Sequence, residues 1–200
     1  VHFRSEVSQD IEGDAEFKQV PVTLQPVFSD TDVEVDIDLP ASVSLSGLHQ
    51  LNAEWAIVGD YTWTDWSSIP ELRFKFENGL PDSVTSFDWR DTSRVALGGI
   101  YTPQGSVWSY RFGVAYDESP VRNAKSRSAR LPDNDRIWVG IGAGFRPSEK
   151  LQVDVGYAHL FIDDAKIRKT AKGEDATRGA LNGSYEASVD VLSIAAQYQF

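Results

Sequence analysis

The sequence contains no cysteine and no methionine. Without cysteine, the chain can form neither a disulfide framework nor a thiolate metal site. It also lacks any run of about eighteen apolar residues, which excludes a transmembrane helix. No basic and apolar leader precedes the first strand, so no signal peptide is visible. Because the chain begins at Val1, we expect it to be a processed or truncated piece of a longer protein.

Positive charge is in the minority: 19 Lys and Arg against 30 Asp and Glu give a formal net charge of −11. That balance argues against general nucleic-acid binding. No glycine-rich loop of the phosphate-binding type occurs. The three histidines, His2, His49 and His159, lie far apart and lack the spacing of metal ligands. We therefore expect no metal site and no cofactor.

The chain is rich in aromatic residues, 12% with six Trp among them, and in period-two alternation. The stretch 189–200 shows this pattern most clearly. Its apolar side carries Leu192, Ile194, Ala196, Tyr198 and Phe200. Such alternation predicts a strand with one apolar and one mixed face. It suits a half-buried strand of a soluble β-sandwich as well as a lipid-facing strand of a transmembrane β-barrel.

The connections between the expected strands separate these two alternatives. About eight strands fit the sequence, and their connections alternate in length. The long ones lie near 119–135 and 169–185, and the short turns lie at 48–52, 103–106 and 147–150. If the strands alternate in direction, every short turn lies on the side of Phe200, which is typical of outer-membrane barrels. The sequence therefore favours an all-β fold, an antiparallel transmembrane β-barrel of about eight meander strands.

Local signals add detail to this barrel. The segment 8–31 is predicted to be irregular, and the strand that starts at Trp55 is expected to bend at Pro70. Asn78-Gly79 predicts a turn, after which one strand is expected to return from Phe87 to Tyr101. Bulky residues on the lumen parity, Trp138 among them, indicate a barrel wider than eight strands enclose.

Several motifs follow one another in a fixed order. They include Gly13-Asp14-Ala15, Ala53-Glu54-Trp55-Ala56-Ile57, Thr64-Asp65-Trp66-Ser67, Trp89-Arg90-Asp91, Tyr116-Asp117-Glu118-Ser119-Pro120-Val121 and Leu131-Pro132-Asp133-Asn134-Asp135-Arg136-Ile137-Trp138. As an ordered set that spans almost the whole chain, they resemble the FadL/TodX family of outer-membrane long-chain fatty-acid and hydrocarbon transport proteins.

The resemblance implies the architecture and function of the whole protein. It implies a fourteen-stranded barrel with an N-terminal hatch, of which residues 1–200 are the C-terminal portion as a single β-barrel domain. The hatch, the first strands and the kinked strand with the lateral opening are absent from this chain. The implied function is passive uptake of long-chain fatty acids or other hydrophobic molecules. The alternatives are an aromatic-hydrocarbon channel and a structural or adhesive outer-membrane barrel.

Transport of an amphipath requires an apolar groove and a cation for its carboxylate. Arg94 and Arg111 are the candidate cations on the lumen parity, beside Trp138. They can equally form structural pairs, because charges inside a membrane protein normally find partners. The available carboxylates are Glu54, Asp60, Asp117 and Asp154.

The resemblance does not identify which residue would bind the carboxylate of a fatty acid. The headgroup lysine of the family aligns near Thr85 and does not carry over, although Arg90 is close in sequence. The loop 119–136 is basic and includes Arg127 and Arg130, which are candidates for binding anionic lipid or fatty acid. A loop that is merely solvated is the alternative.

A second group of residues predicts a structural role. Asp133, Asp135 and Arg136 recur in the family pattern, and with Asp117 and Pro120 we interpret them as a brace between loop and strand. The acidic run 30–38 is not expected to bind a divalent cation, because carboxylates that alternate along a strand do not converge.

We expect no enzymatic activity. An outer-membrane phospholipase needs a Ser and His pair on its strands, and Ser193, the nearest inward Ser, has no His in register. The expected location is the bacterial outer membrane. The expected partners are a long-chain fatty acid or other hydrophobic small molecule, outer-membrane lipid and lipopolysaccharide, and the barrel-assembly machinery through the strand that ends in Phe200, with no nucleic acid.

Overall fold

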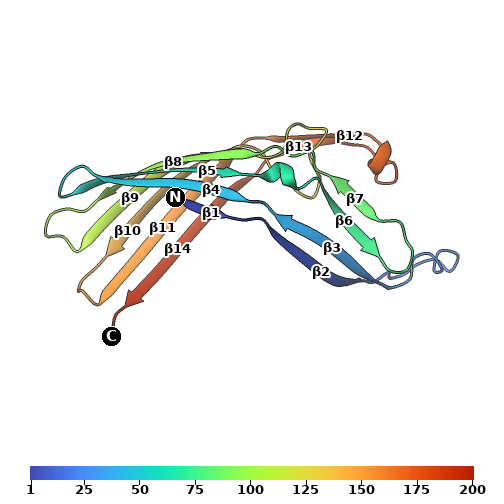
Figure 1. Cartoon of the computed structure of the whole chain (residues 1–200), viewed down its shortest axis with the longest axis horizontal. Helices are drawn as coiled ribbons and strands as arrows, with labels where there is room; N and C mark the ends of the chain where they lie inside the picture. Colours follow the sequence, from blue (N-terminus) through green and yellow to red (C-terminus); the bar gives the residue numbers. More distant parts are fainter.

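The computed structural model describes residues 1–200 and contains three antiparallel sheets (Figure 1). The largest sheet has eight strands in the order β1-β4-β5-β8-β9-β10-β11-β14. Its strands are β1 (His2–Arg4), β4 (Ser42–Gln50), β5 (Trp55–Thr64), β8 (Thr92–Tyr101), β9 (Trp108–Asp117), β10 (Arg136–Phe145), β11 (Leu151–Ile162) and β14 (Ser188–Tyr198). The expected eight-stranded antiparallel meander is confirmed.

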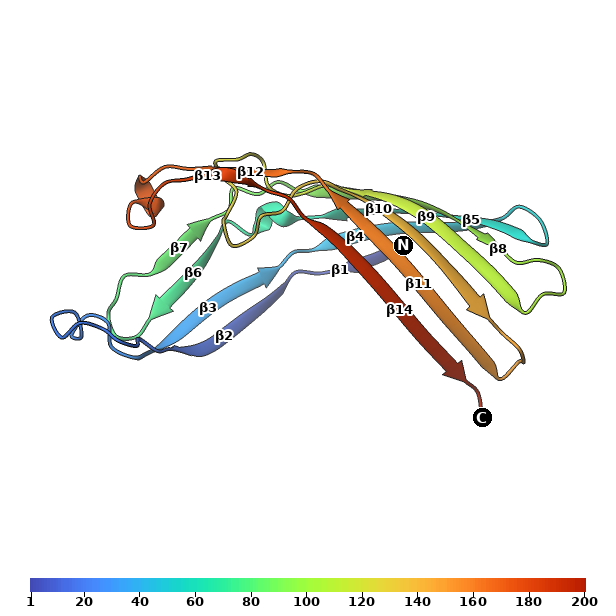
Figure 2. The same ribbon diagram turned by 180° about the vertical axis from the view of Figure 1, so that it is seen from behind.

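The eight-stranded sheet does not close on itself. β1 and β14 are the two ends of the strand order, and no backbone ladder joins them. Each therefore presents a free edge of unpaired N–H and C=O groups, which a lipid environment does not satisfy. In Figure 2, seen from behind, β14 runs along one border of the sheet to the C-terminus. A partial barrel accounts for this arrangement, whereas a closed eight-stranded barrel does not.

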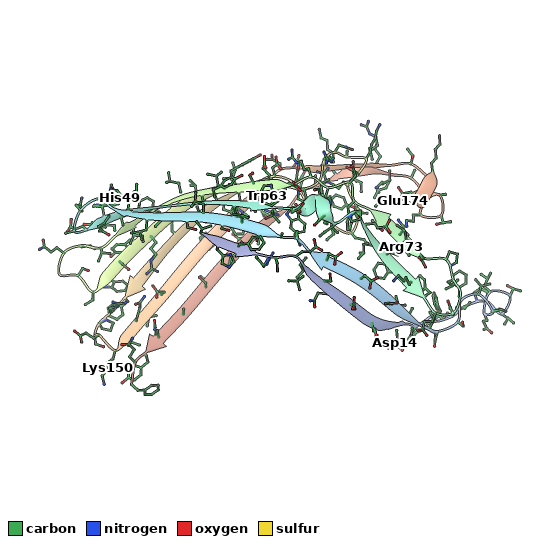
Figure 3. The ribbon with its side chains drawn as sticks, viewed as in Figure 1. Asp14, His49, Trp63, Arg73, Lys150 and Glu174 are labelled. Carbon is green, nitrogen blue, oxygen red and sulfur yellow. The ribbon has the colours of Figure 1, made fainter.

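The two ends of the large sheet differ in the length of their connections. The short turns 51–54, 102–107 and 146–150 join strands at the end where β14 terminates. Figure 3 labels His49 and Lys150 at this end of the molecule, and Asp14 and Glu174 at the opposite end. All long excursions leave from the opposite end. The predicted sorting of short and long connections is therefore present.

The long excursions build two further sheets. β2 (Val7–Ala15), β3 (Thr31–Leu39), β6 (Glu71–Phe76) and β7 (Ser83–Ser86) form a four-stranded sheet in the order β2-β3-β6-β7. β12 (Ala165–Lys169) and β13 (Leu181–Tyr185) form a two-stranded one. Figure 1 shows both beyond the same end of the large sheet, with the four-stranded sheet turned at an angle to it.

The helical content is two single 3-10 turns, Trp66–Ser68 and Gly173–Asp175. Neither is long or apolar enough to cross a membrane.

Three local expectations need correction. The segment 8–31 is not irregular throughout, because β2 occupies Val7–Ala15 and pairs with the whole length of β3. The stretch from Phe87 to Tyr101 is not one strand. Asp88 has a φ of 48°, which breaks the extended backbone between β7 and β8. The loop 169–185 contains β13, whose pairing with β12 is a long-range contact that a local pattern does not reveal.

Side chains alternate between the two faces of the large sheet. Leu192, Ile194 and Ile141 expose 70%, 71% and 62% of their surface on the convex face. The register places them in line with Tyr157, Val155 and Phe112 of neighbouring strands, so this face is a continuous apolar belt. Apolar side chains thus point outward rather than into a dry centre, as the barrel prediction requires.

Candidate functional site

The concave face of the large sheet holds a groove of about 860 Å³. Its walls are mostly apolar or small side chains and include Leu48, Val58, Ala96, Ile100 and Ala115. Glycines on four neighbouring strands leave its floor free of side chains: Gly98, Gly113, Gly140, Gly142 and Gly156. The groove therefore has room and apolar surface for an elongated hydrophobic molecule.

Arg94 lies at the upper boundary of this groove. Its Cζ atom stands 5.5 Å from the ring centroid of Trp138 on β10, a cation–π arrangement. Its Nη1 atom is 3.7 Å from Asp60 Oδ1, too far for a close ion pair. The Asp60 carboxylate instead accepts hydrogen bonds from Ser46 at 2.7 Å and Thr62 at 3.2 Å. Arg94 is therefore positioned by the indole ring and only weakly engaged by a carboxylate.

Trp138 also carries a buried polar group that has no hydrogen-bond partner. Its indole Nε1 is buried, and no side-chain or backbone acceptor lies within hydrogen-bonding distance of it. A buried donor without a partner carries a desolvation cost. The sequence pattern placed Trp138 on the lumen side, but its contact with Arg94 follows only from the register of β8, β9 and β10.

Arg111 is engaged quite differently from Arg94. Its Nη1 atom is 2.6 Å from Asp154 Oδ1, and Gln152 donates to the other oxygen of that carboxylate at 2.7 Å. This pair joins β9 to β11 and holds the Arg111 charge against the wall of the groove. Of the two lumen arginines, Arg94 is the one with more freedom to meet a ligand.

A second cavity, of about 580 Å³, lies above Arg94 on the side of the long excursions, and we call it the upper cavity. Trp66, Trp89, Leu131 and Pro132 form its apolar walls, and Arg94 lines both this cavity and the groove. Arg130 also lines it and stands 5.4 Å from the ring centroid of Phe74, with no carboxylate within ion-pair distance. The two cavities thus meet at a single arginine.

The predicted brace residues come together beside the upper cavity. Arg136 donates to Asp117 and to Asp133, both at 2.8 Å. Asp135 accepts the backbone N–H of Ser119 at 2.7 Å, and Asp133 accepts the Ser119 hydroxyl at 2.9 Å. These bonds fasten both ends of the loop 118–135 to the ends of β9 and β10.

Arg90 and Arg127, offered by the sequence as ligand cations, make structural contacts in the loops. Arg90 Nε donates to the Ser119 carbonyl at 3.2 Å. Arg127 is 4% exposed, and its guanidinium donates to the carbonyls of Asp133 and Lys166. Burial lowers the pKa of Arg127 from its usual value. Arg127 binds the loop from within, and Arg90, which is half-exposed, donates to the loop from its surface. Arg94 and Arg130 are therefore the candidate cations that donate no close hydrogen bond to a protein acceptor.

Sequence reasoning missed two groups of residues that shape the site. Ser119, 1% exposed, is the centre of the brace, and only its place between Glu118 and Pro120 hinted at a role. Trp66 and Trp89 pack edge to face with ring centroids 5.4 Å apart and form a wall of the upper cavity. No periodic pattern predicted their contact, because Trp66 opens the 3-10 turn after β5 and Trp89 follows β7 outside the named strands.

Comparisons with known proteins agree with this geometry. A family model described as outer membrane protein transport protein (OMPP1/FadL/TodX) matches residues 1–200. A putative outer membrane protein of Neisseria meningitidis serogroup B is 31% identical over 219 aligned residues, which cover 100% of this chain and 47% of that protein. The long-chain fatty acid transport protein of Escherichia coli O6:H1 is 31% identical over 176 residues, 82% of this chain and 39% of that protein.

The fold is also found among solved structures. The crystal structure of a Pseudomonas aeruginosa FadL homologue superposes with a TM-score of 0.85 at 25% identity, over 98% of this chain and 47% of that one. The chain therefore spans about half the length of the relatives it matches, which explains why its large sheet has two free edges. The chain belongs to the outer membrane protein transport protein family (OMPP1/FadL/TodX) and forms part of a β-barrel of the bacterial outer membrane.

Proposed function

We propose that the whole protein is a passive channel for long-chain fatty acids and similar hydrophobic molecules, and that this chain supplies one wall of the passage. The observation that carries the proposal is the junction at Arg94, where the apolar groove meets the upper cavity. A tail in the groove loses its contact with water, which is worth about 0.8 kcal/mol per CH₂. A carboxylate headgroup gains a charge-assisted hydrogen bond from a cation that no close partner occupies.

The two accessible arginines suggest an order of events. Arg130 lies at the outer cavity without a carboxylate partner, and Arg94 lies deeper, at the groove. A fatty acid that enters between the loops meets Arg130 first and Arg94 second. Trp66 and Trp89 offer apolar contact to the tail along the way. Closure of the remaining wall and the exit belong to segments outside this chain.

Calorimetry of the full-length protein with oleate and toluene tests this proposal. Arg94→Gln is expected to weaken oleate binding about tenfold, the value of one charge-assisted hydrogen bond, and to leave toluene binding unchanged. Arg111→Gln is the matched control, because its partner is Asp154, and it is expected to leave the affinity for oleate within about twofold. A protein that binds neither compound is no channel for hydrophobic molecules.

The same measurement separates the alternatives. Binding of toluene without oleate identifies an aromatic-hydrocarbon channel, which the uncharged walls of the groove also permit. A structural or adhesive barrel binds neither and copurifies with no hydrophobic ligand. The proposal involves no chemical step: the histidines lie apart on β1, β4 and β11, and Ser193 donates to the carbonyl of Gly156 rather than to a histidine.

We extend the proposal to assembly of the barrel. The outward side of β14 carries Tyr198, whose ring packs against that of Phe200 with centroids 5.3 Å apart. These features suit recognition by the barrel-assembly machinery. Phe200→Ser is expected to reduce the yield of folded protein in cells and to leave refolding in detergent unchanged, with the folded fraction read from heat-dependent gel mobility. An equal loss in both settings assigns Phe200 to stability alone.

A further inference from the structure

The β12–β13 hairpin reaches from the end of the large sheet to the four-stranded sheet. β12 follows β11, β13 precedes β14, and the connection between them contains the 3-10 turn Gly173–Asp175. In both Figure 1 and Figure 2 this turn lies near β7, the last strand of the four-stranded sheet. The hairpin therefore joins two parts of the chain that are far apart in the sequence.

Two side chains near the tip of the hairpin bind the backbone of β7. Glu174 accepts the backbone N–H of Ser86 at 3.1 Å. Arg178 donates to the backbone carbonyl of Val84 at 2.7 Å. Residues two apart in a strand direct their backbone groups to the same edge, and this edge of β7 pairs with no other strand of the chain. The two side chains thus take the place of a neighbouring strand.

The base of the hairpin is bound to the loop 118–135. Arg127 donates to the carbonyl of Lys166 on β12, and its side chain is buried within the loop. The backbone N–H of Arg168 donates to the carbonyl of Ala124 at 2.8 Å. One hairpin therefore holds the loop at its base and the four-stranded sheet at its tip.

The two joints differ in their exposure to water. At the base, the residue Arg127 is 4% exposed. At the tip, the side chains of Glu174 and Arg178 are 28% and 34% exposed. Water competes for charged hydrogen bonds that it can reach, so the joint with β7 is the weaker of the two.

The four-stranded sheet is built to move as a body. The chain passes between this sheet and the large sheet four times, and each passage is a break between strands, at 5–6, 40–41, 65–70 and 87–91. Pro40 lies in one break and offers no N–H to a ladder, and Asp88 in another has a φ of 48°. Hinges consist of a few such residues at the ends of rigid elements, so the breaks form a line about which the sheet can pivot.

The position of the four-stranded sheet affects the upper cavity. The loop 118–135 contributes Arg130, Leu131 and Pro132 to the cavity wall. Phe74 on β6 packs over Arg130, with the Cζ atom 5.4 Å from the ring centroid. When the sheet pivots away from the loop, Phe74 leaves the guanidinium and uncovers it.

We propose that the β12–β13 hairpin is a strap that holds the four-stranded sheet against the loop 118–135, and that its release from β7 opens the upper cavity. Release requires Glu174 and Arg178 to exchange the backbone of β7 for water. The base of the strap stays on the loop, so the sheet is the part that moves. The strap itself is independent of the cargo, whereas its role in admitting a ligand rests on the proposed function.

The test of the strap uses the full-length protein with spin labels at two exposed positions, Glu77→Cys after β6 and Lys125→Cys in the loop. This chain has no cysteine of its own to compete for the labels. Pulsed electron paramagnetic resonance measures the distance between them. Arg178→Ala is expected to raise the population at longer distance about twofold to fivefold, the effect of losing one partly exposed charged hydrogen bond. Arg168→Ala is the matched control, because this exposed arginine lies on β12 opposite Asn182, and it is expected to leave the distances unchanged.

The rate of oleate association, followed by stopped-flow tryptophan fluorescence, tests the opening of the cavity. Arg178→Ala is expected to bind oleate about twofold to fivefold faster than the wild type, in step with the larger open population. Glu174→Ala removes the other contact with β7 and is expected to act in the same direction. It decides the question if Arg178→Ala does not fold.

Each remaining outcome has one meaning. Distances that neither Arg178→Ala nor Glu174→Ala changes contradict the strap. A longer distance without faster association overturns the opening of the cavity. If the wild-type protein does not bind oleate, the proposed function fails, and the label distances alone decide whether the strap holds the sheet.

Discussion

Arg111 on β9 and Asp154 on β11 form an ion pair of 2.6 Å across the face of β10, the strand that separates them. The pair is possible because β10 has Gly144 at the crossing. A Cβ atom at Gly144 would lie 2.8 Å from Asp154 Oδ1 and 2.6 Å from Ser109 Oγ. A side chain at this position therefore displaces the pair, whereas glycine leaves room for it.

Gly144→Val is expected to destabilise the full-length barrel by about 1–3 kcal/mol, the usual cost of a side chain forced into an occupied space. Thermal unfolding in detergent measures the effect. Gly47→Val is the control, since a Cβ atom at Gly47 meets nothing within 4 Å. If both variants melt alike, Gly144 is not needed for the ion pair.

The facing of the strands gives a second prediction. Ile141 is 62% exposed in the outward apolar belt, and Gln197 has the opposite parity, paired with Gln152. Ile141→Arg places a charge in the lipid and is expected to cost about 2–4 kcal/mol, whereas Gln197→Arg is expected to be mild. Denaturant unfolding of the two variants in lipid vesicles compares these costs. Equal losses of stability contradict the facing described above.

The four-stranded sheet gives a prediction about pH. The β2–β3 ladder sets acids directly opposite one another: Asp10 and Asp36, Glu12 and Glu34, Asp14 and Asp32. Opposed like charges destabilise a sheet. Lys75 on β6 lies 2.8 Å from Asp36, and this hydrogen bond and the Lys75 charge lower the pKa of Asp36 below 3.8 and raise that of Lys75 above 10.5.

The sign of the effect follows from linkage. The lowered pKa of Asp36 stabilises the fold above pH 3.8, and this contribution is lost as the pH falls through the folded value. The raised pKa of Lys75 contributes below pH 10.5 and is lost as the pH rises through its folded value. Lys75→Met is expected to move the titration midpoint of the Asp36 carboxyl upward, as followed by NMR. An unchanged midpoint would falsify the assignment of the shift to Lys75.

The buried guanidinium of Arg127 gives a fourth prediction. It donates to carbonyls of the loop 118–135 and of β12, so Arg127→Leu leaves these carbonyls without their donor. We expect the loop to open more often, by about 1–3 kcal/mol, with faster limited proteolysis between 118 and 135. Lys125→Ala, an exposed neighbour, is expected to change nothing. Unaltered proteolysis in Arg127→Leu contradicts a holding role for this side chain.

Much of the fold was predictable because alternation reports which face of a strand meets lipid. The outward parity of Ile141, Leu192 and Ile194 followed from sequence alone, as did the side on which the short turns lie. β2 was missed because it carries acids opposite acids and few apolar residues. β2 is a strand because of its long-range ladder with β3, and no local sequence pattern indicates it.

The candidate site was predictable only as a list of side chains. The sequence offered Arg94 and Arg111 as cations on the lumen parity, Arg90 as a residue near the family's lysine position, and Arg127 and Arg130 as cations of a basic loop. In the structure, strand register and loop packing decide their partners. Arg111 forms an ion pair with Asp154, Arg90 and Arg127 donate hydrogen bonds to backbone carbonyls, and Arg94 lies over the ring of Trp138. Spacing along the chain does not encode these choices, since each partner lies at least six residues away and most lie on other strands or loops.

The sequence by itself determined that the chain is a membrane β-sheet, with an apolar face, a mixed face and its long loops on one side. These properties are local, since they depend on period-two alternation and turn residues that act within a few positions. Only the tertiary structure decided that the sheet stays open and that the groove meets the upper cavity at Arg94. Those relationships arise when strands far apart in the sequence align in one register, which fixes the distances between side chains.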